Sequence, residues 1–263
     1  MVIFDHLGRK LFLKDTPKRI ISLVPSQTEL IVDLGLKESL QGITKFCVHP
    51  KELRKEKKIV GGTKTIHLDR IKALRPDIIL CNKEENTKEI VTALEKIAPV
   101  HVSDVSSISQ SLQLILDYGE LFNVEKEAES LVSKIANKLK NLSEKLQDKK
   151  WESCVYLIWK DPYLAAGSDT FINELLLLNK LENKILQTRY PEVSLAQLES
   201  YSSDLLLLSS EPYTFKDNHV EDLKNNGFNA IKVDGEYFSW YGSRLEKAID
   251  YFNDSVAQFS TSK

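Results

Sequence analysis

The stretch VEKEAESLVSKIANKLKNLSEKLQDKK, residues 124–150, decides the fold predicted for this chain. Its apolar residues recur at every third or fourth position: Val124, Ala128, Leu131, Ile135, Leu139, Leu142 and Leu146. This period places one apolar stripe along an amphipathic helix. The stretch contains no glycine or proline, and at ~1.5 Å per residue it would run roughly 35–40 Å. We therefore expect one long, stiff helix that joins two lobes.

Strands and helices alternate on both sides of this helix. Apolar runs such as IISLV (20–24), DIILC (77–81) and DLLLL (204–208) are typical of parallel strands whose sheet is covered by helices. The predicted fold class is α/β, with two three-layer α/β lobes, parallel sheets and a ligand cleft between the lobes. We expect an N-terminal lobe over residues 1–123, the connecting helix over 124–150 and a C-terminal lobe over 151–263.

Smaller features add local detail to the first lobe. Residues 2–13 read as a hairpin with its turn near Gly8. The segment SQTE (26–29) has the pattern of a capping box that would open the next helix, and Gly35 is placed to end that helix.

An internal repeat links the two lobes. IHLDRIKALRPDIIL (66–80) aligns with VSLAQLESYSSDLLL (193–207), so that Leu68 meets Leu195, Ile71 meets Leu198 and Asp77 meets Asp204. Two similar lobes predict two sheets whose carboxyl edges face a cleft, which is where ligands bind in open α/β sheets.

Composition excludes several classes of function. The 38 acidic and 36 basic residues nearly cancel, so the whole chain has no basic field for nucleic acid or an anionic membrane. Its apolar runs are too short to span a bilayer. The cysteines Cys47, Cys81 and Cys154 are widely spaced and suggest no disulfide framework. Residues 1–19 lack the pattern of a secretory signal, so we expect a cytoplasmic protein, or a periplasmic or other extracytoplasmic one whose signal was removed.

At this point the sequence resembles a known family. RIISLVPSQTELIVDLGL, QGITKFCVHP, VGGTKTIHLDRIKALRPDIILC and the late segment WYGSRLEKA are similar to ABC-transporter solute-binding proteins with a helical backbone. That family includes cobalamin-, haem- and siderophore-binding proteins, and the cobalamin branch looks most similar. The resemblance implies capture of a corrinoid or other metal chelate for ABC-type import, no catalysis and no intrinsic cofactor. We expect a monomer.

The resemblance also implies a set of ligand-binding residues. In the first lobe it points to Phe46 and His49, in the loop after the second strand. In the second lobe the matching positions are Trp159, Tyr163, Tyr190, Glu236, Tyr237, Trp240, Tyr241 and Arg244. Flat rings suit the faces of a macrocycle, and Arg244 could hold a carboxylate or phosphate, although it could equally pair with a nearby acid.

Docking to a permease is expected to use one acidic residue on each lobe of such a protein. The first position falls on Asp69, but the second falls on Ala196, which is not acidic. Glu192 and Glu199 are the alternative acidic positions, so a permease partner is expected with less support than a ligand.

Two other classes of function stay open. A receptor for a bare metal ion would draw on the histidines, which are His6, His49, His67, His101 and His219. They lack HxH or HxxxH spacing, and we expect no metal site. A tetrapyrrole-handling enzyme such as a chelatase would pair His49 or His67 with Glu236.

Overall fold

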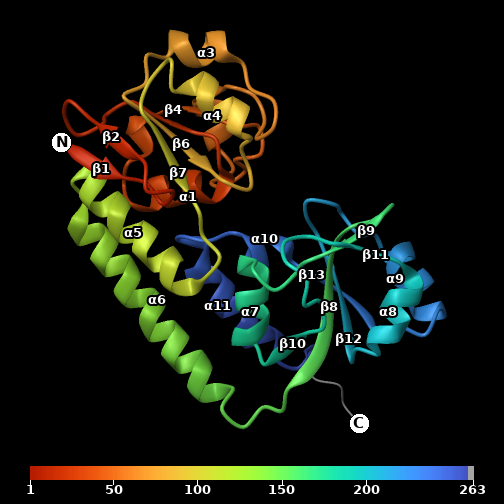
Figure 1. Ribbon diagram of the computed structural model, residues 1–263. Helices are drawn as coiled ribbons and strands as arrows, with labels where there is room; N and C mark the ends of the chain where they lie inside the picture. The colour runs from red at the N-terminus through yellow and green to blue at the C-terminus, as the bar shows by residue number, and fades with distance from the viewer. Residues whose placement is uncertain (260–263) are drawn as a thin grey trace. The chain divides into compact units, whose positions relative to one another are not determined.

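One parallel sheet and one mixed sheet organise the chain in the computed structural model, which describes residues 1–259 (Figure 1). Contacts between Cα atoms divide the chain into two compact units. Unit 1 comprises Met1–Val105, Ser109–Lys134 and Tyr241–Arg244. Unit 2 comprises Ser106–Ile108, Ile135–Trp240 and the described chain from Leu245 onward. The lobe boundaries at residues 123 and 150 stay a prediction, because the long helix contributes to both units.

Unit 1 contains a five-stranded sheet in the order β5-β4-β3-β6-β7, with all neighbours parallel. Its strands are β3 Ile20–Ser22, β4 Leu40–Ile43, β5 Lys58–Ile59, β6 Ile78–Asn82 and β7 Val100–Ser103. Its helices are α1 Pro25–Asp33, the 3-10 turn η1 Lys37–Ser39, α2 Leu53–Glu56, α3 Leu68–Ala73, α4 Lys88–Leu94 and α5 Ile108–Phe122. The predicted alternation of strands and helices is confirmed.

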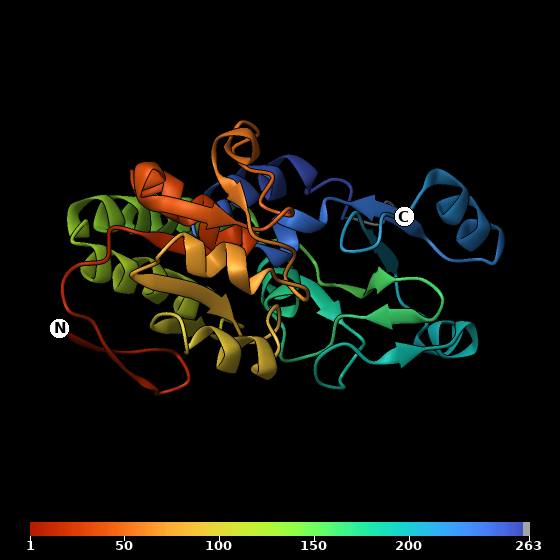
Figure 2. The same cartoon turned by 90° about the horizontal axis from the view of Figure 1, so that it is seen from above.

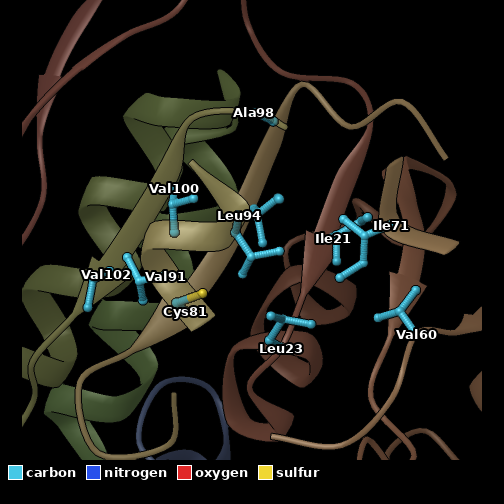
Figure 3. Packing of buried hydrophobic residues seen from close by; sticks show 11 residues of the cluster. Ile21, Leu23, Val60, Ile71, Cys81, Val91, Leu94, Ala98, Val100 and Val102 are labelled. Atoms are coloured by element: carbon cyan, nitrogen blue, oxygen red, sulfur yellow. The ribbon is translucent and has the colours of Figure 1, made fainter. Parts of the chain in front are cut away.

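The core of unit 1 lies between this sheet and its helices. Figure 3 shows Val91 and Leu94 of α4 packed beside Cys81 of β6 and Val100 of β7. Leu94 and Cys81 have no exposed surface, which agrees with the apolar runs read from the sequence.

Helix α1 begins differently from the prediction. Pro25 is its first residue, Val24 is the N-cap, and no side chain caps the helix. The predicted capping box at residues 26–29 is therefore wrong, since proline at N1 fixes the helical φ angle and the helix begins two residues earlier than predicted. Gly35 adopts a φ of +80° just after the helix, as expected for a terminating glycine.

The predicted hairpin is present as β1 Val2–Phe4 and β2 Lys10–Phe12, an antiparallel pair. Asp5 holds its turn, because Oδ1 accepts hydrogen bonds from the backbone N–H groups of Leu7 and Arg9. Asp5 Oδ2 also accepts from the N–H of Val102 at 3.2 Å, and the N–H of His6 donates to the Val102 carbonyl at 3.2 Å. The hairpin is thereby fixed to the edge strand β7.

The long helix is α6, Glu125–Lys145. Its predicted stripe is confirmed, because Ala128, Ile135 and Leu142 have no exposed surface. Near its start, α6 lies beside α5 (Figures 1 and 2), and a Cβ at Gly119 would stand 2.6 Å from that of Ala128. Only glycine at position 119 allows the two helices to approach this closely.

Unit 2 contains a six-stranded sheet in the order β11-β9-β8-β12-β13, with β10 also paired to β8. Its strands are β8 Glu152–Trp159, β9 Tyr163–Ala165, β10 Leu181–Asn183, β11 Glu192–Val193, β12 Leu205–Ser209 and β13 Ala230–Val233. Its helices are α7 Phe171–Leu178, α8 Leu195–Tyr201, α9 Asp217–Asn225, α10 Gly235–Ser239 and α11 Arg244–Ser255. The antiparallel strands β9 and β11 were not predicted, because each has at most three residues and no clear periodicity.

The sequence repeat corresponds to a repeated structural unit. Helix α3 leads into β6 in unit 1, and α8 leads into β12 in unit 2. The aligned aspartates accept equivalent hydrogen bonds in the two units. Asp77 Oδ2 accepts from the N–H groups of Lys18 and Arg19, just before β3. Asp204 Oδ2 accepts from the N–H and hydroxyl of Ser153, at the start of β8. In each unit this carboxylate fixes the start of the neighbouring strand.

Candidate functional site

The carboxyl ends of parallel strands are where α/β proteins place ligand-binding loops. In unit 1, Phe46 lies in the loop after β4 with 49% of its surface exposed. Lys45 Nζ stands 5.0 Å from the centroid of this ring. A Cβ at Gly62, in the loop after β5, would lie 3.1 Å from Phe46 Cε2, so the two loops are in contact. His49 is partly exposed in the same loop as Phe46.

Glu85 is a candidate in unit 1 that the sequence analysis missed. It is half-buried in the loop after β6. Burial raises the pKa of the Glu85 carboxyl, while the positive charge of Lys64 and a hydrogen bond from Thr63 oppose the rise. A signal for it was available, because the segment NKEEN directly follows the apolar strand run.

Tyr241 is held inside unit 1 rather than presented to solvent. Gln27 Nε2 donates to its hydroxyl at 3.0 Å, and Ser103 Oγ lies 3.1 Å from the same oxygen. Tyr118 in turn donates to Gln27 Oε1 at 2.8 Å. Burial raises the pKa of Tyr241 to about 12, although these hydrogen bonds lower it in part. The ring is 7% exposed, so its geometry fits a structural role.

Arg244 is also enclosed within unit 1. Its Nε donates to Glu29 Oε2 at 2.8 Å, and the two side chains are 4% and 3% exposed. Of the two roles considered for Arg244, pairing with a nearby acid is the one that this geometry favours.

In unit 2, Trp159 ends strand β8. The residues Cys154–Ile158 before it are buried, whereas Trp159 is 39% exposed. Tyr213, in the loop after β12, stands edge-on to this indole with 5.5 Å between ring centroids. Tyr213 is not among the predicted site residues, although it follows the strand run DLLLLSS. The two rings form an aromatic pair at the carboxyl edge of the sheet.

Tyr163 and Tyr190 lie on the antiparallel side of the same sheet. Tyr163 opens β9, pairs with Val193 of β11 and is partly exposed. Burial raises the pKa of Tyr163, and the positive charge of Lys160 opposes the rise. Tyr190 is partly exposed just before β11.

The aromatic cluster after β13 is engaged mostly with protein groups. Trp240 is 8% exposed, and its Nε1 donates to Glu211 Oε1 at 2.8 Å. Ser239 Oγ donates to the same oxygen at 2.6 Å. Tyr237 stacks on Tyr251 with centroids 4.8 Å apart. Glu236, in the first turn of α10, is partly exposed.

The positions considered for docking to a permease are all exposed. Asp69 lies in the first turn of α3, and Ala196, Glu192 and Glu199 lie in or near α8. Within residues 1–259, no three His, Cys, Asp or Glu side chains are grouped so that they could hold a metal ion. No helix in this part of the chain is long and apolar enough to cross a membrane.

Comparison with known proteins identifies the family. Residues 20–230 match the family described as periplasmic binding protein. The chain belongs to this family. The two-lobed α/β fold class is thereby confirmed, and members of the family act as solute-binding components that work with ABC permeases.

Individual relatives of this periplasmic binding protein cover nearly the whole chain. An uncharacterized ABC transporter substrate-binding lipoprotein of Bacillus subtilis, YvrC, is 28% identical over 97% of this chain and 85% of its own length. A vitamin B12-binding protein of Vibrio campbellii is 24% identical over 95% of this chain and 92% of its own length.

Solved structures agree in fold. The periplasmic vitamin B12-binding protein BtuF of Vibrio cholerae has a TM-score of 0.79 at 16% identity, covering 94% of this chain and 99% of that one. A periplasmic haem-binding protein of Pseudomonas aeruginosa has a TM-score of 0.80 at 18% identity, covering 93% and 94%. At these identities the likeness concerns the fold. The predicted cleft between the lobes stays a prediction.

Proposed function

We propose that this periplasmic binding protein captures a corrinoid, and that the exposed aromatic side chains at the carboxyl edges of its sheets contact the ligand. The observation that carries the proposal is the Trp159–Tyr213 pair. A large indole is left exposed at the end of a buried strand, directly beside a second ring. Phe46 gives unit 1 an exposed ring at the corresponding edge of its own sheet.

The chemistry of these rings supports a macrocyclic ligand. Aromatic faces cover the apolar surface of a corrin or porphyrin, and neighbouring polar groups meet its edge. In this proposal Phe46, His49, Trp159, Tyr163, Tyr190 and Glu236 contact the ligand, together with Glu85 and Tyr213. Tyr237, Trp240, Tyr241 and Arg244 act by positioning the loops, because each is buried or engaged with protein groups.

The remaining parts of the proposal follow from the family. The protein would bind its ligand reversibly without transforming it, carry no intrinsic cofactor, act outside the cytoplasm and deliver the ligand to a permease. Asp69 is the proposed docking residue of unit 1. The vitamin B12-binding relatives support cobalamin over haem or a ferric siderophore as the ligand.

Calorimetric titration of the purified protein with cyanocobalamin, haemin and a ferric siderophore tests the proposal. We expect tight, one-to-one binding of cyanocobalamin and much weaker binding of the other two. Tight binding of haemin alone would show that the ligand is haem and not a corrinoid. Chemical change of a bound tetrapyrrole, such as loss or insertion of its metal over many turnovers, would favour the chelatase alternative and contradict the proposal.

A further inference from the structure

The N-terminal hairpin presents an apolar face that ligand capture does not explain. In its register Val2 lies opposite Phe12 and Phe4 lies opposite Lys10. Because side chains alternate along a strand, these four residues share one face of the hairpin. Val2, Phe4 and Phe12 are 48%, 65% and 68% exposed, and Lys10 is also exposed. We call this set the hairpin patch.

The hairpin patch is held in a fixed position. Leu11, on the opposite face of β2, is 6% exposed and packs inward. The buried carboxylate of Asp5 and the N–H of His6 attach the turn to β7, as described above. Arg9 adds hydrogen bonds to Asp5, Glu95 and the Val100 carbonyl, at 2.8, 2.6 and 2.8 Å. The exposed rings therefore lie on an ordered surface of unit 1.

Basic side chains accompany these rings. Lys10 lies in the patch, with Nζ 5.3 Å from the centroid of Phe12. A groove beside the patch is lined by Lys10, Phe12, Lys96 and Pro99, and also by Arg9 and Glu95, whose opposite charges pair at 2.6 Å. Lys96, like Lys10, is exposed. The whole chain is close to neutral, but here lysines and exposed rings occur together.

We propose that the hairpin patch contacts the surface of a membrane that contains anionic lipids. Aromatic rings are favoured at the boundary between headgroups and acyl chains, and nearby lysines reach the lipid phosphates. A second copy of the chain fits less well, since a stable protein interface needs about 800 Å² from each partner. Three partly exposed side chains on a two-stranded hairpin do not supply that area. The proposal is independent of the ligand's identity.

Co-sedimentation with phospholipid vesicles tests this contact. The full-length protein is mixed at low ionic strength with vesicles of phosphatidylglycerol or of phosphatidylcholine, over a range of lipid concentrations. We expect preferential binding to phosphatidylglycerol that weakens as salt is added. The double variant Phe4→Ser/Phe12→Ser should reduce the partition coefficient about tenfold or more, and Lys10→Gln about fivefold.

Trp151→Ser provides a matched control. Trp151 is an exposed ring of unit 2, 53% exposed, and Lys180 Nζ stands 5.2 Å from its centroid. Its substitution should leave vesicle binding unchanged. Urea unfolding of each variant checks that the fold persists, and Lys10→Glu, which leaves both rings in place, serves if the double variant is unstable.

Three results would overturn the proposal. The first is no binding of the wild-type chain to phosphatidylglycerol vesicles at low salt. The second is equal binding of the wild-type chain and a folded patch variant. The third is self-association of the wild-type chain, seen by light scattering, together with no binding to vesicles. If the patch variants then abolish self-association, the patch is a contact between two copies of the chain.

Discussion

Arg244 Nε and Glu29 Oε2 form a buried ion pair at 2.8 Å within unit 1. The segment Tyr241–Arg244 belongs to unit 1, whereas Trp240 before it and Leu245 after it belong to unit 2. The ion pair therefore fixes one end of a short segment at which the chain passes between the units. The same segment is also held by Tyr241, whose hydroxyl accepts from Gln27, and by Gly242, whose N–H donates to Ser111 Oγ at 2.8 Å.

Breaking this ion pair should destabilise the protein strongly. We expect Arg244→Met or Glu29→Gln to lower the free energy of unfolding by about 3–5 kcal/mol, because one polar or charged partner remains buried without the other. Chemical denaturation monitored by circular dichroism measures the change. The double variant Arg244→Met/Glu29→Gln should lose less than the two single losses added together.

The exposed ion pair of Lys138 and Asp250, with 2.7 Å between Nζ and Oδ2, is the control. Lys138→Met should cost about 1 kcal/mol or less, because water screens such pairs. Equal effects of Lys138→Met and Arg244→Met would contradict a special role for the buried pair.

The affinity for the ligand should depend on one end of strand β8 and not on the other. Trp159 ends the strand at its carboxyl edge, and Trp151 precedes its first residue. Under the proposed function, Trp159→Ala should weaken ligand binding by about 10- to 100-fold, the loss typical of an aromatic anchor. Trp151→Ala should leave the dissociation constant unchanged in the same calorimetric titration. Loss of affinity in both variants, or in neither, would remove the Trp159–Tyr213 pair from the site.

The stability of the protein should depend on pH through His101. This ring is 2% exposed, and burial together with the nearby His6 lowers its pKa to about 4. In the unfolded chain the pKa of this histidine is about 6.5. Between about pH 4 and pH 6.5, His101 therefore binds a proton in the unfolded chain but not in the folded chain. The free energy of unfolding therefore falls as pH drops from about 6.5 toward 4, by about 2 kcal/mol at pH 5 relative to pH 8. In His101→Leu this part of the pH dependence should disappear from urea titrations.

His6 should act in the opposite direction. Burial alone would lower the pKa of His6, but hydrogen bonds to the Asp117 carboxylate and the Asp104 backbone raise it above its ordinary value. Its contribution to stability is fully present below the unfolded pKa of about 6.5 and is lost as pH rises through the higher folded pKa. His6→Gln should therefore destabilise the protein more at pH 5.5 than at pH 8.5. A pH-independent loss would show that His6 acts by packing alone.

The two adjacent glycines after β5 should respond differently to substitution. Gly61 has a φ of +133°, and a Cβ there would collide with the backbone of Thr65. A Cβ at Gly62 would meet side chains alone, the ring of Phe46 at 3.1 Å and Lys45 Cε at 3.6 Å. We expect Gly61→Ala to cost at least about 1–3 kcal/mol from strain and Gly62→Ala less than about 1 kcal/mol, because a partly exposed ring can move. Urea midpoints of the two variants compare these costs, and similar midpoints would contradict the argument.

Local pattern was sufficient to predict the long helix and the central parallel strands of each unit. The apolar period of α6, the parallel strand runs and the alignment of Asp77 with Asp204 are readable because burial of one face imposes a fixed spacing on neighbouring residues. The start of α1 was not predicted correctly, because a proline at N1 and a capping-box pattern that begins at the next residue are competing signals for the same boundary. The short antiparallel strands β9 and β11 have too few residues to show any period.

For the candidate site, the family resemblance carried by the sequence indicated which loops present aromatic rings. Only the tertiary structure decided which rings stay exposed. Trp159 remains exposed beside Tyr213. Trp240, in contrast, is hydrogen-bonded to Glu211, and Tyr241 is hydrogen-bonded to Gln27. These partners come from segments far apart in the chain, and their meeting depends on the order of strands in the sheets. Periodicity indicates which face of a helix or strand is buried. It carries no information about which distant side chain will contact a given residue.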